Sequence, residues 1–199
     1  MDVVFGRSTT GESVAEVDLD ETSLSIAEVV EQARSHGAGL VWAHGGCPGD
    51  GFEPRSGYAH LHAADPRPGT VLPMAAAEEY GPLLAEAYLG QWGHKWVEPD
   101  QPLPTDGSVV LTLREQGVPV GVCRLWPDQR LVDMPGVVPR LRGAERTVRL
   151  LGAACAVLGP GSVDVDSWGE SPEVLRACGE LGFAVTEQQR GWELRLGPR

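Results

Sequence analysis

The sequence is poor in basic residues. Its 199 residues include 16 Lys and Arg but 28 Asp and Glu, which gives a formal net charge of −12 at pH 7. Nucleic-acid binding needs clustered Lys and Arg to neutralise phosphates, and the chain has one short arginine cluster, within residues 140–146. We therefore expect no nucleic-acid partner. An acidic surface favours cationic small molecules instead.

Long apolar runs and paired cysteines are also lacking. No apolar run approaches the length of a membrane span, so we expect no membrane partner. The opening residues MDVVFGRSTTG lack the basic segment and the apolar segment of an export signal, and the expected location is the cytoplasm. The four cysteines form no CxxC pair, which favours reduced, packed thiols over disulfides or a zinc site.

The first third of the chain predicts one helix and two strands. Ser25 and Glu28 form a capping box before an amphipathic helix that ends at Gly37. The segments GAGLVWAH (37–44) and GYAHLHAAD (57–65) are typical of strands, and the proline-rich segment DPRPGTVLP predicts a linker with a boundary near Pro68. The apolar content of 42% is enough for a buried core.

The rest of the chain alternates helices and strands. Gly81 and Pro82 interrupt the helical segment 74–92, so the helix is expected to start at Pro82. Three strands follow as an antiparallel meander, then helix, strand, helix and strand. The expected segments are 108–116, 118–126, 130–138, a helix from Arg142 to Gly159, 162–168, 171–181 and 191–196. The predicted fold class is α/β, with an α+β type of mixed sheet.

A weak internal repeat suggests two units. A Gly-x-Gly, Gly-Phe, Gly-aromatic series occurs at residues 37–58 and again at 159–192. One interpretation is a truncated half-unit at residues 1–66 and a complete unit at residues 70–199; the other is chance, because helix and strand units that end in glycine are common. The unpaired edges of a half-unit predict that it extends the main sheet or pairs with a second copy, as in a homodimer.

The segment Gly136-Val137-Val138-Pro139-x-x-Arg142-Gly143 precedes an apolar helix, and Leu181-Gly182-Phe183 follows a second helix. These motifs and their order resemble the GNAT acyl-CoA N-acyltransferase superfamily over residues 70–197. The half-unit in front is similar to tandem members such as mycothiol synthase. The resemblance implies an acyl-CoA cofactor, acetyl-CoA or another thioester.

In that superfamily the strand ending in V-x-P opens away from its parallel neighbour, and the pantetheine enters the gap as a pseudo-strand, here along residues 134–138 with Val137 and Val138. The pyrophosphate rests on the amides of the following turn. The matching residues are Arg142, Gly143, Ala144, Arg146 and Thr147. Glu145 and Thr147 replace two glycines. Repulsion from Glu145 costs on the order of 1 to 3 kcal/mol, which a nearby guanidinium of Arg140, Arg142 or Arg146 offsets; the alternative is an ordinary helix start without ligand.

Acyl transfer to an amine needs a base, an oxyanion donor and an acid for the thiolate. The oxyanion donor would be a backbone N–H near Val137. The family's acid position, four residues before Gly182, is held here by Cys178, which is equally suited to a packed core. Asp133, with Glu98 and Asp100 as other carboxylates, is the candidate base; each could instead simply face solvent.

Trp92, His94 and Trp96 lie where the family often builds its acceptor pocket, and their rings suit a cation, although aromatic residues are more often core. His44, His60 and His62 allow a metal site to be drawn, but no further ligand completes it, and no metal is expected. The main hypothesis is acyl transfer from acyl-CoA directly to a small-molecule amine. The alternative is a catalytically silent GNAT-like protein that binds a ligand or partner.

Overall fold

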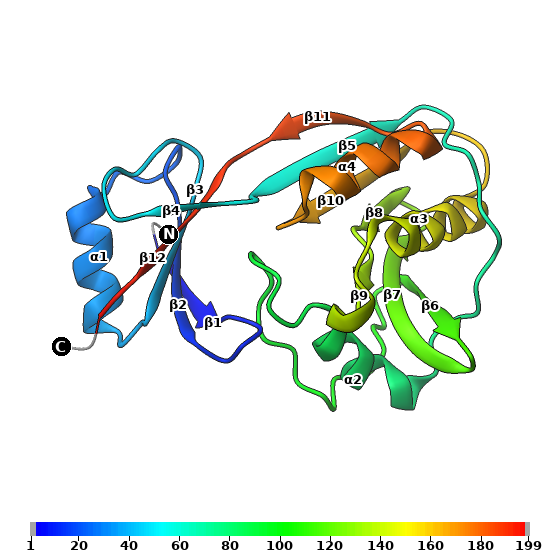
Figure 1. The fold of residues 1–199 in the computed structure, drawn as a ribbon, viewed down its shortest axis with the longest axis horizontal. Helices are drawn as coiled ribbons and strands as arrows, with labels where there is room; N and C mark the ends of the chain where they lie inside the picture. Colours follow the sequence, from blue (N-terminus) through cyan, green and yellow to red (C-terminus); the bar gives the residue numbers. More distant parts are fainter. Residues whose placement is uncertain (1–2, 198–199) are drawn as a thin grey trace.

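The computed structural model describes residues 3–197, which form two mixed β-sheets side by side (Figure 1). The described helices are α1 (Ile26–Ser35), α2 (Ala77–Ala87), α3 (Ala144–Leu158) and α4 (Pro172–Cys178). The five-stranded sheet has the order β1 (Val4–Arg7), β2 (Ser13–Asp18), β3 (Leu40–His44), β12 (Gly191–Arg195) and β4 (Glu53–Arg55). The larger sheet has the order β11 (Ala184–Gln188), β5 (Tyr58–Ala63), β10 (Val163–Trp168), β8 (Leu131–Asp133), β7 (Val118–Trp126) and β6 (Val109–Glu115), and β9 (Gly136–Val137) also pairs with β7.

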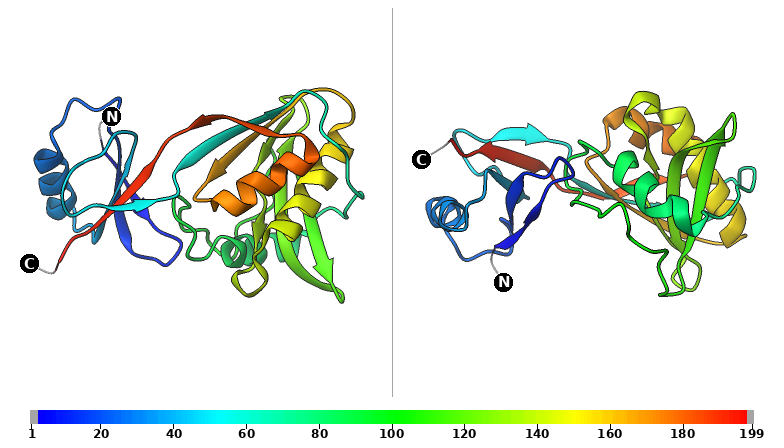
Figure 2. Two further views of the ribbon diagram at one scale, coloured as in Figure 1. Left: turned by 45° about the horizontal axis from the view of Figure 1, so that its top comes forward. Right: turned by 90° about the horizontal axis from the view of Figure 1, so that it is seen from below.

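The two sheets exchange one strand each. β5 lies between β10 and β11 in the larger sheet, and β12 lies between β3 and β4 in the smaller one (Figures 1 and 2). The β4–β5 connection passes close to the β11–β12 connection. A Cβ added to Gly57 would come within 2.2 Å of the Gln189 carbonyl oxygen, so this close approach requires glycine. β5 therefore extends the larger sheet, one of the two outcomes expected for the half-unit.

Strand directions follow the same order in both sheets. β2 and β3 are parallel and are followed by the antiparallel pairs β3–β12 and β12–β4; β8 and β10 are parallel and are followed by β10–β5 and β5–β11, also antiparallel. This agreement suits the interpretation of a repeat. The division into units at residues 1–66 and 70–199 stays a prediction, and each sheet contains a strand from the other side of that boundary.

Several predicted elements are confirmed, and two needed correction. The Ser25–Glu28 capping box is present, with Val29 and Ala33 buried. The helix expected from Pro82 instead starts at Ala77 and contains Pro82, because Tyr80 in its first turn is buried in the core and the proline removes a single helical hydrogen bond.

The run 130–138 is two strands rather than one, because Pro135 has no N–H to continue the ladder. The meander of β6, β7 and β8 is antiparallel as predicted. The sequence pattern does not predict the strands β1, β2, β4 and β11.

Two larger hydrophobic cores hold these layers, and a small third cluster contains Val14, Leu40, Trp42 and Trp92, with Trp168 packed against it. The larger core packs α2, α3 and α4 against the larger sheet, and the smaller core packs α1 against the smaller sheet. α2 contacts β7 and β9, while α3 contacts β6, β7 and α4. Within residues 3–197, every helix is too short or too polar to cross a bilayer.

Candidate functional site

Two parallel strands separate in the middle of the larger sheet. β8 pairs with β10 from Leu131–Asp164 to Asp133–Asp166, and the last bond runs from the Met134 N–H to the Asp166 carbonyl at 2.8 Å. The chain then continues as β9, which pairs with β7. The parallel strands thus part after Met134, as the resemblance implied. We call the space between β9 and the end of β10 the opening.

The backbone groups that face the opening follow from the register. The Val138 N–H donates to the Val120 carbonyl at 3.0 Å, so the neighbouring residue, Val137, directs its N–H and C=O away from β7. Asp166 bonds toward β8, so Trp168, two residues later, directs its N–H and C=O to the same side. The opening is therefore bordered by the main chain of Val137 and Trp168 and by the Met134 carbonyl.

The carbonyls of the opening already have donors. The Tyr88 hydroxyl donates to the Met134 carbonyl at 2.8 Å, and Arg142 Nε donates to the Val137 carbonyl at 3.2 Å. The Trp168 carbonyl accepts from His94 Nε2 at 3.1 Å and from Gln91 Nε2 at 3.2 Å. No acceptor for the Val137 or Trp168 N–H is found within residues 3–197. The opening therefore offers hydrogen-bond donors, which suit an oxygen that gains negative charge.

His94 is a neutral donor in this arrangement. Burial lowers its pKa to about 4, and its hydrogen bond to the Trp168 carbonyl opposes that shift only in part. Because a carbonyl oxygen can only accept, the imidazole proton lies on Nε2. The ring also stacks on Tyr88, with centroids 4.1 Å apart. The two side chains therefore support each other at the edge of the opening.

A cavity of about 470 Å³ connects the opening to the start of α3, and we call it the α3 cavity. The first turn of α3 has N–H groups without intrahelical partners and no side-chain cap, which is a favourable place for an anion. A Cβ added to Gly143 would meet no atom within 4 Å, so the backbone there is open to a ligand. The lining of the α3 cavity includes Pro135, Val137, Arg142, Gly143, Ala144, Thr147, Gly169, Glu170, Ser171 and Val174.

The predicted cofactor residues divide into two groups. Val137, Arg142, Gly143, Ala144 and Thr147 line the α3 cavity, whereas Val138 and Arg146 do not. Glu145 is exposed and is not part of the lining, so its carboxylate does not fill the cavity. The roles of these residues in cofactor binding stay predictions.

The arginines expected to offset Glu145 are bonded elsewhere. Arg140 pairs with Glu86 at 2.5 Å, and Arg146 pairs with Glu115 at 2.8 Å. Arg142 donates to three carbonyls, those of Val137, Ala87 and Leu89. A phosphate at this turn would thus meet backbone amides first, and a guanidinium would reach it only by exchanging one of these partners.

A second cavity of about 300 Å³ lies along residues 133–134, and we call it the Asp133 cavity. Its lining includes the carboxylates Asp133 and Asp166, next to Met134, and ring side chains from Tyr80, Tyr88, His94, Trp96 and Trp168. The α3 cavity is lined by the next residues of the same segment, Pro135 and Val137. The two cavities share no lining residue, but they adjoin neighbouring residues of the segment where the strands separate.

Asp133 carries the unpaired charge of its cavity. Burial raises the pKa of its carboxyl to about 6, partly opposed by the charge of Arg124. Arg124 itself pairs with Asp106 at 2.6 Å, and Lys95 pairs with Glu16 at 2.8 Å. No hydrogen bond to the Asp133 carboxylate is present in the described part of the chain. A carboxylate with this pKa is suited to accept a proton near neutral pH.

The other predicted residues fall in several places. His94 and Trp96 line the Asp133 cavity, whereas Trp92 lines the α3 cavity. Cys178 is fully buried and lines neither cavity, and burial raises its thiol pKa to about 12. Glu98 and Asp100 also line neither cavity. The sequence pattern does not indicate Tyr88, Gln91 and Glu170. Tyr88 and Gln91 reach the opening through the packing of α2, and Glu170 reaches it from the segment that follows β10.

The metal site considered at His44, His60 and His62 is wrong, because the structure does not bring the three side chains together. His44 lies on β3 of the smaller sheet and bonds Glu16 at 2.9 Å, whereas His60 and His62 lie on β5 of the larger sheet. In the described chain, no group of three or more His, Cys, Asp or Glu side chains is arranged to hold a metal ion.

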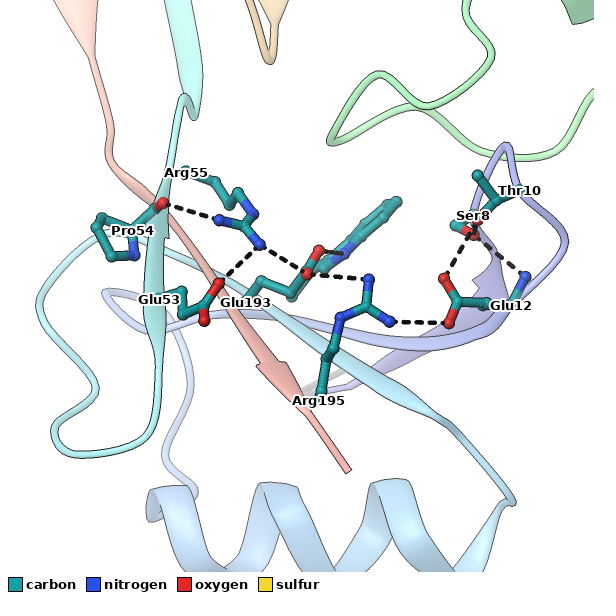
Figure 3. A network of polar contacts seen from close by, with 9 residues as sticks. Ser8, Thr10, Glu12, Glu53, Pro54, Arg55, Glu193 and Arg195 are labelled. Atoms are coloured by element: carbon teal, nitrogen blue, oxygen red, sulfur yellow. Dashed lines mark hydrogen bonds and ion pairs between the residues drawn. The ribbon is translucent and has the colours of Figure 1, made fainter. Parts of the chain in front are cut away.

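A third cavity of about 270 Å³ adjoins the α3 cavity and shares Arg55, Gly90, Gln91 and Trp92 with it. Its charged side chains bind one another (Figure 3): Arg55 pairs with Glu193 at 3.0 Å, and Arg195 pairs with Glu12 at 3.1 Å. Glu193 is buried and also accepts the Trp42 N–H at 3.2 Å. The charges of Glu12, Arg55, Glu193 and Arg195 balance one another, and their pairs link strands and a loop of the smaller sheet.

Comparison with known proteins identifies the architecture. No family model matches the sequence, and no curated protein matches it. A GCN5-related N-acetyltransferase from Kribbella flavida aligns over 99% of this chain and 90% of its own, at 16% identity and a TM-score of 0.52. A GCN5-related N-acetyltransferase-like protein from Streptococcus suis aligns over 98% and 83%, at 10% identity and a TM-score of 0.52. A functionally unknown conserved protein from Staphylococcus epidermidis aligns over 93% and 84%, at 9% identity and a TM-score of 0.55. The chain therefore has the fold of the GNAT acyltransferases.

Proposed function

We propose that this protein is an N-acyltransferase that moves an acetyl or other acyl group from acyl-CoA directly to the amine of a small molecule. One observation carries the proposal: the α3 cavity and the Asp133 cavity adjoin the same short segment, residues 133–137, where β8 and β10 separate. A cofactor and an acceptor could approach that segment from separate cavities and meet there. Direct transfer requires this arrangement.

The α3 cavity fits the cofactor through its backbone. The amides at Gly143 and Ala144 and the Thr147 hydroxyl would hold the pyrophosphate, and Val137 would border the pantetheine. When bound, acyl-CoA supplies an activated thioester carbonyl and a thiolate leaving group. With Arg142 and Arg146 bonded to other groups, we expect modest affinity for the phosphates.

Groups of the protein itself would then transfer the protons and stabilise the developing negative charge. The Asp133 carboxylate takes the proton of the acceptor amine, directly or through water. The Val137 N–H donates to the oxygen that becomes negative during transfer. Glu170 lines the α3 cavity and burial raises its pKa, so its carboxyl is better placed than the Cys178 thiol to return a proton to the thiolate.

The acceptor is expected to be cationic. Asp133 supplies an unpaired negative charge, and the rings of Trp96 and Trp168 offer faces for a positive charge. The net charge of −12 favours the same class of substrate. The cytoplasmic location and the possible pairing with a second copy stay predictions from the sequence.

Calorimetric titration with acetyl-CoA tests the cofactor, and release of free thiol with a panel of amines tests turnover. We expect saturable binding, and tighter binding in Glu145→Gly because a repulsive charge is removed. Asp133→Asn should abolish most turnover while retaining cofactor binding, with Glu98→Gln as the control carboxylate outside both cavities. Absence of binding at millimolar acetyl-CoA, in wild type and in Glu145→Gly, would contradict the proposal.

A catalytically silent ligand- or partner-binding protein is the second candidate. It is favoured by the pairing of Arg140 with Glu86 and of Arg146 with Glu115, which leaves no free guanidinium on the described turn for a phosphate. Under this alternative, the protein releases no thiol with any amine, even if acetyl-CoA binds.

A further inference from the structure

The register of β8 and β10 defines the bond that is missing at the opening. Asp164 N–H donates to Arg130, and Met134 N–H donates to Asp166, in the regular order of a parallel ladder. The next bond in that order would join the Trp168 N–H to the Met134 carbonyl. The pairing of β8 with β10 ends at Asp133 and Asp166, so the Trp168 N–H and the Met134 carbonyl do not bond to each other.

Side chains from one segment stand in for that ladder. Tyr88 donates to the Met134 carbonyl, and Gln91 and His94 donate to the Trp168 carbonyl. Arg142 donates to the Val137 carbonyl on the other border. We propose that Tyr88, His94 and Arg142 are positioning residues that hold the two strands apart before a ligand binds and leave the Val137 and Trp168 N–H groups as the binding points of the opening.

The positioning residues are anchored to the end of α2. Tyr88 is the C-cap of α2. Arg142 also donates to the carbonyls of Ala87, the last residue of α2, and of Leu89, just beyond the cap, which have no helical donors. The Tyr88 ring lies against Gly136, where an added Cβ would come within 2.8 Å of Cζ. The side chains whose hydrogen bonds satisfy the carbonyls of the opening are thus anchored to α2, and no ligand is needed to hold them there.

This arrangement restricts what the opening can bind. A buried carbonyl needs a donor, and each carbonyl of the opening has one from a side chain. A ligand would therefore bind here mainly through its oxygen atoms, because the N–H groups of Val137 and Trp168 lack acceptors whereas the carbonyls already have donors. Oxygen acceptors such as an amide or thioester carbonyl fit this pattern; this ligand step rests on the proposed function, whereas the positioning role does not.

Amide hydrogen exchange by NMR on the ligand-free protein tests the positioning role. In Tyr88→Phe the Met134 carbonyl loses its donor, and we expect the strands to close so that the Trp168 N–H exchanges about tenfold more slowly than in wild type. Tyr58→Phe is the matched control, because its hydroxyl bonds the Asp166 side chain on the same strand without facing the opening. An unchanged Trp168 exchange rate in folded Tyr88→Phe would overturn the inference.

Two further measurements complete the test. If Tyr88→Phe fails to fold, His94→Phe removes one of the two donors to the Trp168 carbonyl while retaining a ring, and the same exchange readout applies. Calorimetry with acetyl-CoA should show at least tenfold weaker binding for Tyr88→Phe and no change for Tyr58→Phe; equal losses in both would overturn the ligand step. Wild-type protein that binds no acetyl-CoA would defeat the proposed function, while the exchange rates would still decide the positioning role.

Discussion

The guanidinium of Arg146 donates to both carboxylate oxygens of Glu115, from Nε at 2.8 Å and from Nη2 at 3.1 Å. Arg146 lies in the first turn of α3, and Glu115 ends β6. The pair lowers the pKa of Glu115 through the hydrogen bond with Arg146. A cation that could serve the proposed phosphate site is thus held by the neighbouring strand.

Glu115→Gln should release that cation. We expect the affinity for CoA to rise by roughly three- to tenfold at low ionic strength, because a free guanidinium can form charge-assisted bonds to phosphate. Titration calorimetry measures the change, and added salt should reduce it. Glu79→Gln, which breaks the separate Arg114 pair, is the control. Equal affinities in wild type and Glu115→Gln would show that Arg146 cannot reach the ligand.

The rate of acyl transfer should follow the ionisation of Asp133. Burial raises its pKa to about 6, and the base must be ionised to accept a proton, so kcat/KM should rise with pH up to that value and then level off. Asp133→Asn should lower kcat by roughly 10² to 10⁴ and remove this pH dependence. A profile that keeps its rise near pH 6 in Asp133→Asn would assign the ionisation to another group.

Asp133 also predicts a pH dependence of stability. Its folded-state pKa, about 6, lies above the ordinary value of 3.8, so the folded protein binds the proton more tightly than the unfolded chain. Stability therefore decreases as pH rises from about 4 to about 6. The full effect is on the order of 2 to 3 kcal/mol, and Asp133→Asn should recover much of it at pH 8 and little at pH 4. Chemical denaturation at both pH values measures the difference.

His60 should also make the stability of the protein decrease as pH rises, but over a higher pH range than Asp133. Its Nδ1 lies 3.0 Å from Asp166 and its Nε2 lies 3.2 Å from Asp164, and only a protonated ring can donate at both nitrogens. The hydrogen bond with Asp166 raises the His60 pKa above 6.5. The stabilisation is present below pH 6.5 and is lost as pH rises through the raised value.

Thermal unfolding of His60→Gln should therefore show a smaller loss of Tm above pH 6.5 than the wild type. His62→Gln is the matched control on the same strand, because His62 contacts Asp164 through Nδ1 and lacks a second carboxylate. Identical pH profiles for His60→Gln and the wild type would show that the pairing between β5 and β10 does not depend on this ring.

Cys178→Ala should affect stability more than turnover. The thiol is buried among α4 and the larger core and lines neither cavity, so we expect a loss on the order of 1 kcal/mol in unfolding free energy. The rate of thiol release should change less than twofold. A large loss of rate in folded Cys178→Ala would restore the role that the resemblance implied for this position.

The sequence predicts those helix ends that depend on residues close together in the chain. The Ser25–Glu28 capping box and the glycine after the helix at residues 26–35 are short-range features, and both are confirmed. β11 was missed because all its side chains are exposed, so it lacks the alternation that indicates a strand. The expectation that the helix begins at Pro82 is wrong because the burial of Tyr80, which holds the earlier turn in place, cannot be read from helix propensity.

The candidate site was predicted in part for the same reason. Asp133 and Val137 lie on the segment that carries the motif, so the sequence could indicate them. Tyr88 and Arg142 meet that segment only after α2 packs on β9, and their bonds go to main-chain carbonyls, which leave no trace in a residue pattern. The pairing of Arg146 with Glu115 depends on the placement of β6 beside α3.

The strand exchange has a consequence for the order in which the protein can assemble during synthesis. The smaller sheet is built mostly from the first 55 residues, yet its fourth strand, β12, is Gly191–Arg195. On the ribosome, β3 and β4 must therefore keep open edges until residues 191–195 have emerged. During that interval those edges are available to chaperones or to a neighbouring nascent chain.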